Sequence, residues 1–189
     1  MTEKETKQAK KTMVEEIELP EKVTASIAHA LLVIKGPKGE VKRHIAPKNL
    51  KIDAKERSII INAGRQNKTN KKSLKSYAAH IRNMIRGSME GHKYMLKICS
   101  GHFPMNVSVS NNEFIVKNFL GEKVPRTLKL KEGAAVKIDG DHITVESLSK
   151  ETAGQVSADI EQLTRRTRYD PRIFQDGIYI TNKDGKEIE

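Results

Sequence analysis

The sequence predicts an α+β fold of two similar, duplicated domains, each an antiparallel β-sheet with one helix packed on a face. Short apolar or alternating runs bounded by turn residues are typical of strands, and two longer segments repeat apolar residues at helical spacing. The order of two strand pairs followed by a helix occurs twice. We therefore expect a flexible tail over residues 1–14, a first domain over 15–100 and a second over 101–189.

The first half opens with a predicted β-hairpin. An apolar run at residues 30–34 enters a Gly-Pro-Lys-Gly turn at 36–39, and a strand-like segment at 41–45 leaves it. Glycine supplies the backbone angles that a tight hairpin turn needs. A second pair of strands is predicted at 50–53 and 58–61.

An amphipathic helix is predicted after these strands. Its apolar positions are three and four residues apart: Leu74, Tyr77, Ala78, Ile81, Met84 and Ile85. Another face carries a basic stripe, which we define as Lys71, Lys75, Arg82 and Arg86. Like charges on one helix face are destabilising unless an anion lies beside them. The stripe is either a solvated face or one that meets RNA or an acidic neighbour.

The second half repeats the same order. Gly121 lies 82 residues after Gly39 in a similar turn, between an apolar run at 114–116 and a strand-like segment at 124–130. This spacing indicates a duplication.

A second strand pair and a second helix complete this half. The strands are predicted at residues 136–139 and 142–145, and Ser149 is a candidate N-cap for the helix that follows. The apolar positions of that helix are Ala153, Val156, Ile160 and Leu163.

The domain boundary is placed where the segment 101–104, Gly-His-Phe-Pro, separates strand patterns at 94–100 and 105–110. His102 is expected to shape this junction. Cys99, in the strand before it, is expected to be a core residue.

The chain is strongly basic. Its 189 residues include 35 Lys and Arg against 24 Asp and Glu, for a formal net charge of +11. Such a field attracts polyanions. The excess lies in the first part, since residues 1–100 hold 22 basic residues against 10 acidic ones, whereas 101–189 hold 13 against 14.

The segment at residues 165–183 interleaves arginines with aromatic residues. Its arginines are Arg165, Arg166, Arg168 and Arg172, its aromatic residues are Tyr169, Phe174 and Tyr179, and its only acids are Asp170 and Asp176. Guanidinium groups fit phosphate oxygens, and aromatic rings stack on unpaired bases. The segment therefore indicates binding to structured RNA, the alternative being a surface loop of counter-charged arginines.

Individual roles within this segment are less constrained. Gly177 is expected to let the main chain approach the sugar-phosphate surface closely. Tyr179 either stacks on RNA or lies in the core, since it alternates with Ile178 and Ile180. Asp176 is expected to hold its own turn or to orient an arginine.

The sequence lacks the motifs of metal-binding, nucleotide-binding and hydrolytic proteins. The six histidines form no HExxH pattern, and the single cysteine makes an intramolecular disulfide impossible, so neither a metal site nor a cofactor is expected. The glycines at 36 and 39 lack the length of a phosphate-binding loop, and no GxSxG motif occurs. No run approaches the roughly 20 apolar residues that cross a bilayer. A soluble, cytoplasmic, non-catalytic protein is expected.

Three separated segments carry a family resemblance. They are Arg172-x-Phe174-x-Asp176-Gly177-Ile178-Tyr179-Ile180-x-x-Lys183, the segment 101–107 (GHFPMNV) and the segment 118–123 (NFLGEK). Together they resemble the universal ribosomal protein six family of the large subunit, in its archaeal and eukaryotic form. The length, without a long basic C-terminal extension, is similar to archaeal members.

The resemblance implies two sheet-plus-helix domains derived from one ancestor. It also implies a structural role in the large ribosomal subunit, with binding to ribosomal RNA near the sarcin–ricin region and the translation-factor site. Neighbouring ribosomal proteins near the stalk base, and translation factors nearby, are the expected partners. The family places the main RNA anchor in the second domain, whereas charge alone favours the first.

The expected RNA-binding residues combine both arguments: Arg65, Lys68, Lys71, Lys72, Lys75, Arg165, Arg166, Arg168, Tyr169, Arg172, Phe174, Gln175, Gly177, Tyr179 and Lys183. A free RNA-binding regulator or RNA chaperone, using the same surfaces transiently, is the alternative function. An enzyme acting on RNA is a more distant one.

Overall fold

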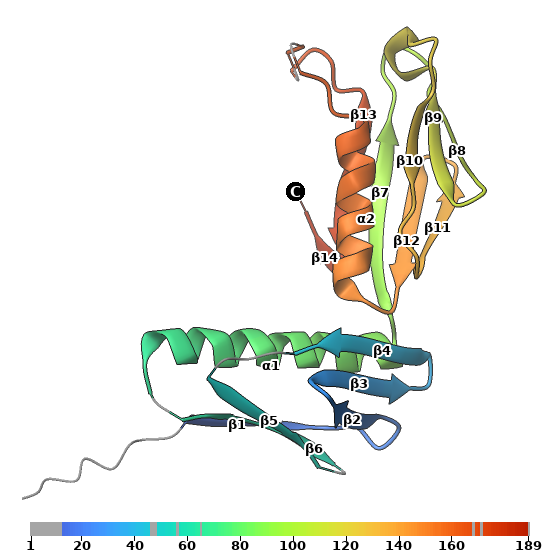
Figure 1. The fold of residues 1–189 in the computed structure, drawn as a ribbon. Coiled ribbons are helices and arrows are strands. Elements are labelled where there is room, and N and C mark those ends of the chain that lie inside the picture. The colour runs from blue at the N-terminus through green and yellow to red at the C-terminus, as the bar shows by residue number, and fades with distance from the viewer. Residues whose placement is uncertain are drawn as a thin grey trace, which may run out of the picture. The chain divides into compact units, whose positions relative to one another are not determined.

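The computed structural model describes residues 13–45, 49–55, 57–64, 66–167, 169–170 and 172–188. The chain divides into two compact units, Met1–Met89 and Glu90–Glu189, each with antiparallel sheets and one long helix (Figure 1). The predicted duplicated α+β fold is confirmed, with two sheets rather than one in each unit.

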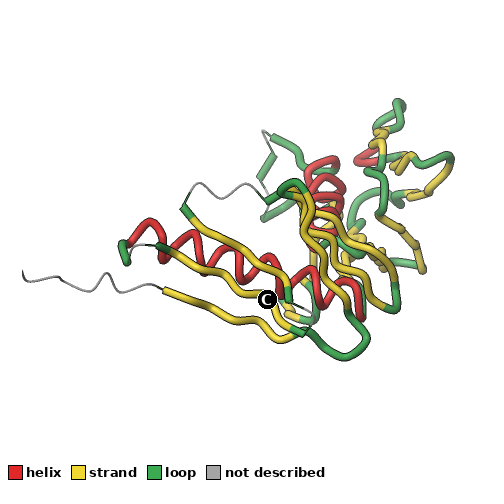
Figure 2. Tube along the Cα trace, turned by 60° about the horizontal axis from the view of Figure 1, so that its bottom comes forward, coloured by secondary structure: helices red, strands yellow, loops and turns green. Residues whose placement is uncertain are grey.

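The first unit contains two three-stranded sheets and helix α1 (Lys68–Met89). One sheet has the order β1-β6-β5, with β1 at Met13–Glu18, β5 at Leu50–Ala54 and β6 at Ser58–Ala63. The other has the order β2-β3-β4, with β2 at Thr24–Ala28, β3 at Leu31–Gly36 and β4 at Gly39–His44. The tube view distinguishes α1 from the strands beside it (Figure 2).

Alternation and helical periodicity explain the core of this unit. Ile59 and Ile61 of β6 are fully buried, as are Ala78 and Ile81 of α1. Asn67 caps α1, because its side-chain oxygen accepts a hydrogen bond from the Asn70 amide at 2.7 Å. The predicted amphipathic helix is confirmed.

The predicted turn at residues 36–39 joins β3 to β4 and lies against the C-terminal end of α1. The Lys38 amide donates to the carbonyl of Ser88 at 3.0 Å. A Cβ atom added to Gly36 would lie 2.6 Å from that carbonyl oxygen. Glycine is therefore required for the hairpin to pack this closely on the helix.

The second unit contains a five-stranded and a three-stranded sheet with helix α2 (Lys150–Leu163). The larger sheet has the order β11-β12-β7-β13-β14, from strands Ala134–Asp139, His142–Ser147, His92–Cys99, Gly177–Lys183 and Lys186–Glu187. The smaller has the order β10-β9-β8, from Arg126–Lys129, Glu113–Lys117 and Asn106–Ser110. A short 3₁₀ helix, η1 (Phe119–Gly121), lies between β9 and β10.

One hydrophobic core joins these elements. Its fully buried members include Leu96 of β7, Phe114 of β9, Ile143 of β12 and Ile160 of α2. Ser149 is the N-cap of α2 as predicted, with its hydroxyl accepting from the Thr152 amide at 3.3 Å.

The structure divides the chain earlier than the predicted 100/101 boundary. Strand β7 pairs with both β12 and β13, so it is the central strand of the second unit. Its buried residues Tyr94, Leu96 and Ile98 complete that unit's core. Met13 and Val14, predicted as part of the tail over 1–14, belong instead to β1; residues 1–12 lie outside the described residues.

Candidate nucleic-acid interface

Arg126 ties the loop before β10 to the C-terminal end of α2. Its Nε and Nη2 atoms each donate to a carboxylate oxygen of Glu122 at 2.7 Å, and Nη1 donates to the Leu163 carbonyl at 2.7 Å. The guanidinium lies 4.4 Å from the centre of the Phe119 ring. The hydrogen bond from Arg126 lowers the pKa of Glu122. A cation here also complements the negative end of the helix dipole.

A row of aromatic rings extends from this network. The Arg166 guanidinium lies 3.6 Å from Glu122 and 4.4 Å from the centre of the Tyr169 ring. Tyr169 contacts Phe174 edge to face at 4.9 Å, and Phe174 stacks on His102 at 4.9 Å. These contacts link Arg166, Tyr169 and Phe174 to His102 of the 101–104 segment.

Asp176 anchors the 101–104 segment instead of its own turn or an arginine, which corrects the prediction for this residue. It accepts hydrogen bonds from the amides of Gly101 at 2.6 Å and His102 at 3.0 Å, and pairs with His102 Nδ1. Burial alone raises the pKa of Asp176, but these hydrogen bonds outweigh it and the pKa lies below its ordinary value. An ionised carboxylate only accepts, so Nδ1 carries the proton and Nε2 of His102 faces away.

A cavity of about 480 Å³ lies between the end of α2 and the start of β13. Six of the residues that line it are Leu120, Glu161, Thr164, Arg165, Tyr169 and Tyr179. Leu120 has a φ of 47°, in the left-handed region that non-glycine residues rarely adopt. Such backbone conformations concentrate at functional sites, so the cavity is a candidate binding site.

Gly177 makes room for a ring. It is buried, and a Cβ atom added to it would lie 3.2 Å from Cζ and Oη of Tyr179. The observed reason for glycine here is therefore the packing of Tyr179. That tyrosine is 42% exposed, which disfavours the core alternative, and partial burial raises its pKa.

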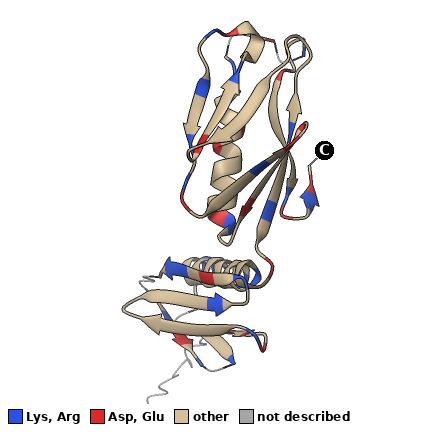
Figure 3. Cartoon of the chain, turned by 90° about the vertical axis from the view of Figure 1, so that its right-hand side faces the viewer, with Lys and Arg blue, Asp and Glu red and all other residues tan. Residues whose placement is uncertain are grey.

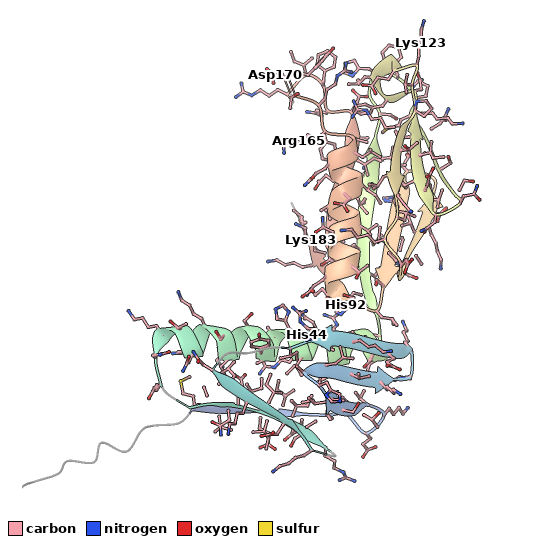
Figure 4. All side chains as sticks on the ribbon, viewed as in Figure 1. His44, His92, Lys123, Arg165, Asp170 and Lys183 are labelled. Carbon is pink, nitrogen blue, oxygen red and sulfur yellow. The ribbon has the colours of Figure 1, made fainter. Side chains whose placement is uncertain are left out.

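The structure brings most of the predicted C-terminal residues together. Arg165, Arg166, Tyr169, Phe174, Gly177 and Tyr179 all line the cavity, and Arg172 and Gln175 are exposed in the loop before β13. Arg165 and Arg172 form no ion pair with any described acid. Lys183 lies near the far end of β13, away from Arg165 (Figure 4). The predicted residues Arg65 and Arg168 lie outside the described residues.

The basic stripe on α1 meets an acid of its own unit. Glu15 of β1 lies 3.3 Å from Lys75 Nζ and 2.7 Å from Arg82 Nη2. Its side chain is only 12% exposed, so this carboxylate is the anion that the sequence left unidentified. The predicted contacts Lys68, Lys71 and Lys72 are exposed near the start of α1 and form no ion pair with a described acid.

Sequence reasoning missed Arg126, Glu122 and the pairing of His102 with Asp176. The spacing of Glu122 and Arg126, four residues apart, was the only local signal. Basic and acidic residues are otherwise spread over both units (Figure 3). Within the described ranges, no group of three or more His, Cys, Asp or Glu could hold a metal ion. No helix in the described part of the chain is long and apolar enough to cross a membrane.

Comparisons with known proteins agree with the resemblance drawn from the motifs. The sequence model of the family described as ribosomal protein L6 matches residues 19–91 and 103–177. The large ribosomal subunit protein uL6 of Methanosarcina mazei is 40% identical over 173 residues, which cover 92% of this chain and 98% of that protein. The uL6 proteins of Natronomonas pharaonis (39% over 166 residues, 88% and 94%) and Methanococcus vannielii (41% over 174 residues, 92% and 96%) are similarly related.

Proposed function

The chain belongs to the ribosomal protein L6 family, and we propose that its second unit anchors it to large-subunit ribosomal RNA near the sarcin–ricin region and the translation-factor site. It is a structural, non-enzymatic constituent of the large ribosomal subunit. The proposed location near the sarcin–ricin region and the translation-factor site is supported by the family resemblance. Ribosomal proteins near the stalk base are the proposed neighbours, translation factors dock nearby, and the ribosome lies in the cytoplasm.

One observation supports the RNA contact: exposed arginines and exposed aromatic rings occur together between the end of α2 and the start of β13. Arg165 and Arg172 are exposed, and neither pairs with a described acid. Tyr169 and Tyr179 are each 42% exposed in the same region. Arginine supplies phosphate contacts, while aromatic faces accept unpaired bases. Lys68, Lys71 and Lys72 of the first unit supply a second, purely electrostatic contact.

The test replaces Arg165 and Arg172 by alanine and measures binding to a large-subunit RNA fragment over a range of salt concentrations. Each lost phosphate contact makes the slope of log K against log salt shallower by about one. A double variant, Lys117→Ala with Lys129→Ala, is the charge-matched control, because it also removes two positive charges, from exposed positions of β9 and β10 outside the predicted contact residues. An unchanged slope in the double variant would remove these arginines from the interface.

A second experiment separates a ribosomal constituent from a free regulator. A constituent remains on purified large subunits through a high-salt wash, whereas a transient factor dissociates. Crosslinking on intact particles then tests the proposed position, and crosslinks confined to RNA far from the sarcin–ricin region would overturn it.

A further inference from the structure

We propose that the cavity beside α2 holds an unpaired guanine base of the bound RNA. This inference rests on the proposed function, because it specifies what the same site recognises. The cavity of about 480 Å³ falls within the size range of small-molecule sites and has both apolar and polar walls.

The aromatic walls suit a flat ring. Tyr169 and Tyr179 line the cavity and each remains 42% exposed, so part of their surface is open to a partner. The Tyr179 ring packs against Gly177, where the absence of a Cβ atom leaves room for the ring. Stacking on an aromatic side chain stabilises any base, because every base has a π-face.

The polar wall selects among bases. Glu161 lines the cavity, and its Oε1 atom already accepts a hydrogen bond from the Ile180 amide at 3.3 Å, which positions the carboxylate. A carboxylate offers acceptors only. Guanine alone presents two adjacent donors, N1–H and N2–H, on its Watson–Crick edge, whereas the other bases mix donors and acceptors there. Guanine is therefore the base that pairs with Glu161 through two hydrogen bonds.

Two other polar side chains that line the cavity, Thr164 and Asp176, do not compete with this pairing. The Thr164 hydroxyl donates to the Glu161 carbonyl at 3.2 Å and accepts from the Ile178 amide at 2.9 Å. Asp176 is held by Gly101 and His102. Of these three side chains, Glu161 is thus the acceptor that distinguishes the base.

The charge distribution orients the nucleotide. Arg165 and Arg166 line the same cavity as Glu161. A phosphate is attracted to the guanidinium groups and repelled by the carboxylate, while a guanine edge has the opposite preference. A nucleotide fits with its base toward Glu161 and its phosphate toward the arginines, whereas a bare phosphate satisfies only half of the site.

The experiment titrates the full-length, ¹⁵N-labelled protein with 5′-GMP, 5′-AMP, 5′-CMP, 5′-UMP and ribose 5-phosphate, following the amides of Gly177, Ile178 and Ile180. We expect 5′-GMP to bind at least about fivefold more tightly than 5′-AMP, the lower end for a bidentate pair. Ribose 5-phosphate should leave these amides unshifted.

Matched variants test each wall. Glu161→Gln keeps an oxygen for the Ile180 amide but presents one donor and one acceptor, so the preference should move from 5′-GMP toward 5′-AMP. Glu146→Gln makes the same change on β12, outside the cavity, and should leave the preference unaltered. Tyr179→Phe should retain binding, and Tyr179→Leu should weaken it.

Equal affinity for the four nucleotides, or an unaltered preference in Glu161→Gln, would overturn the inference. Identical shifts from ribose 5-phosphate and 5′-GMP would do the same, since they would show a phosphate site alone. Binding of each protein to the large-subunit RNA fragment is measured in parallel. If RNA affinity persists while the nucleotides are not distinguished, the cavity proposal fails and the proposed function stands; if RNA affinity is absent, the proposed function itself fails.

Discussion

Replacing Arg126 by methionine tests whether one side chain holds the candidate interface together. The change keeps an apolar stem over Phe119 but removes four hydrogen bonds, two to Glu122 and one each to the carbonyls of Leu163 and Arg165. A hydrogen bond involving a charged group contributes about 1.5–3 kcal/mol. Both partners of the ion pair are more than a fifth exposed, so solvent screening reduces the two bonds to Glu122.

The expected loss in the free energy of unfolding is about 2–4 kcal/mol, dominated by the bond to Leu163 and by the Glu122 carboxylate, which loses both bonds from Arg126 and keeps the more distant Arg166 at 3.6 Å. Urea unfolding followed by circular dichroism measures it, with amide hydrogen exchange locating the loss in the second unit. Adding Glu122→Gln should recover part of the loss, because the double variant no longer carries a carboxylate that has lost its hydrogen bonds from Arg126. A loss below about 0.5 kcal/mol would refute the reasoning, since that is the range of ordinary surface substitutions.

The same pair predicts a pH dependence. The pKa of Glu122 is lowered from 4.5 in the folded protein, mainly by the hydrogen bond from Arg126. A depressed carboxyl pKa contributes stability above its unfolded value, and that contribution disappears as the pH falls through the folded value. The difference in stability between the native chain and Glu122→Gln should therefore be present at neutral pH and vanish on acidification below 4.5. A difference that persists unchanged in acid would contradict this assignment.

Three further changes test other parts of the structure. Gly36→Ala places a Cβ atom 2.6 Å from the Ser88 carbonyl oxygen and should destabilise the first unit by about 1–3 kcal/mol in urea unfolding; a neutral effect would show that the hairpin can move away from α1. Gly177→Ala brings a Cβ atom within 3.2 Å of Tyr179 and should shift its ring resonances and weaken RNA binding, whereas unaltered resonances would contradict the packing role. Residues 90–189 should fold alone and retain RNA affinity, and a random-coil circular dichroism spectrum would refute this independence.

Local sequence patterns were sufficient to predict both α-helices and the first β-hairpin. The three- and four-residue spacing from Leu74 to Ile85 predicted α1, and Ser149 predicted the start of α2, because capping and amphipathicity act within a few residues. The hairpin through Gly39 followed from its turn residues in the same way. The boundary between the two units could not be predicted from such local patterns. Strand β7 follows α1 in sequence, yet it pairs with strands formed more than 40 residues later, His142–Ser147 and Gly177–Lys183.

The candidate site shows the same division. The motif around Gly177 and Tyr179 identified the segment, but the reason for that glycine emerged from a ring that packs across it. Asp176 was predicted to hold its own turn or to orient an arginine, and this prediction was wrong because its partner His102 lies 74 residues away in sequence. Lys183 belongs to the motif and still lies apart from the arginines, because an extended strand separates them.

The sequence by itself determined the two helices, the alternating strands, the family and the strong positive charge, since these depend on neighbouring residues or on composition. Only the tertiary structure decided which charged side chains pair within the chain and which remain available to a binding partner. Glu15 neutralises part of a helix face that begins more than 50 residues later, and Arg126 pairs with Glu122 while capping α2. An ion pair forms wherever the folded chain brings opposite charges together, and that is a property of topology that no local pattern records.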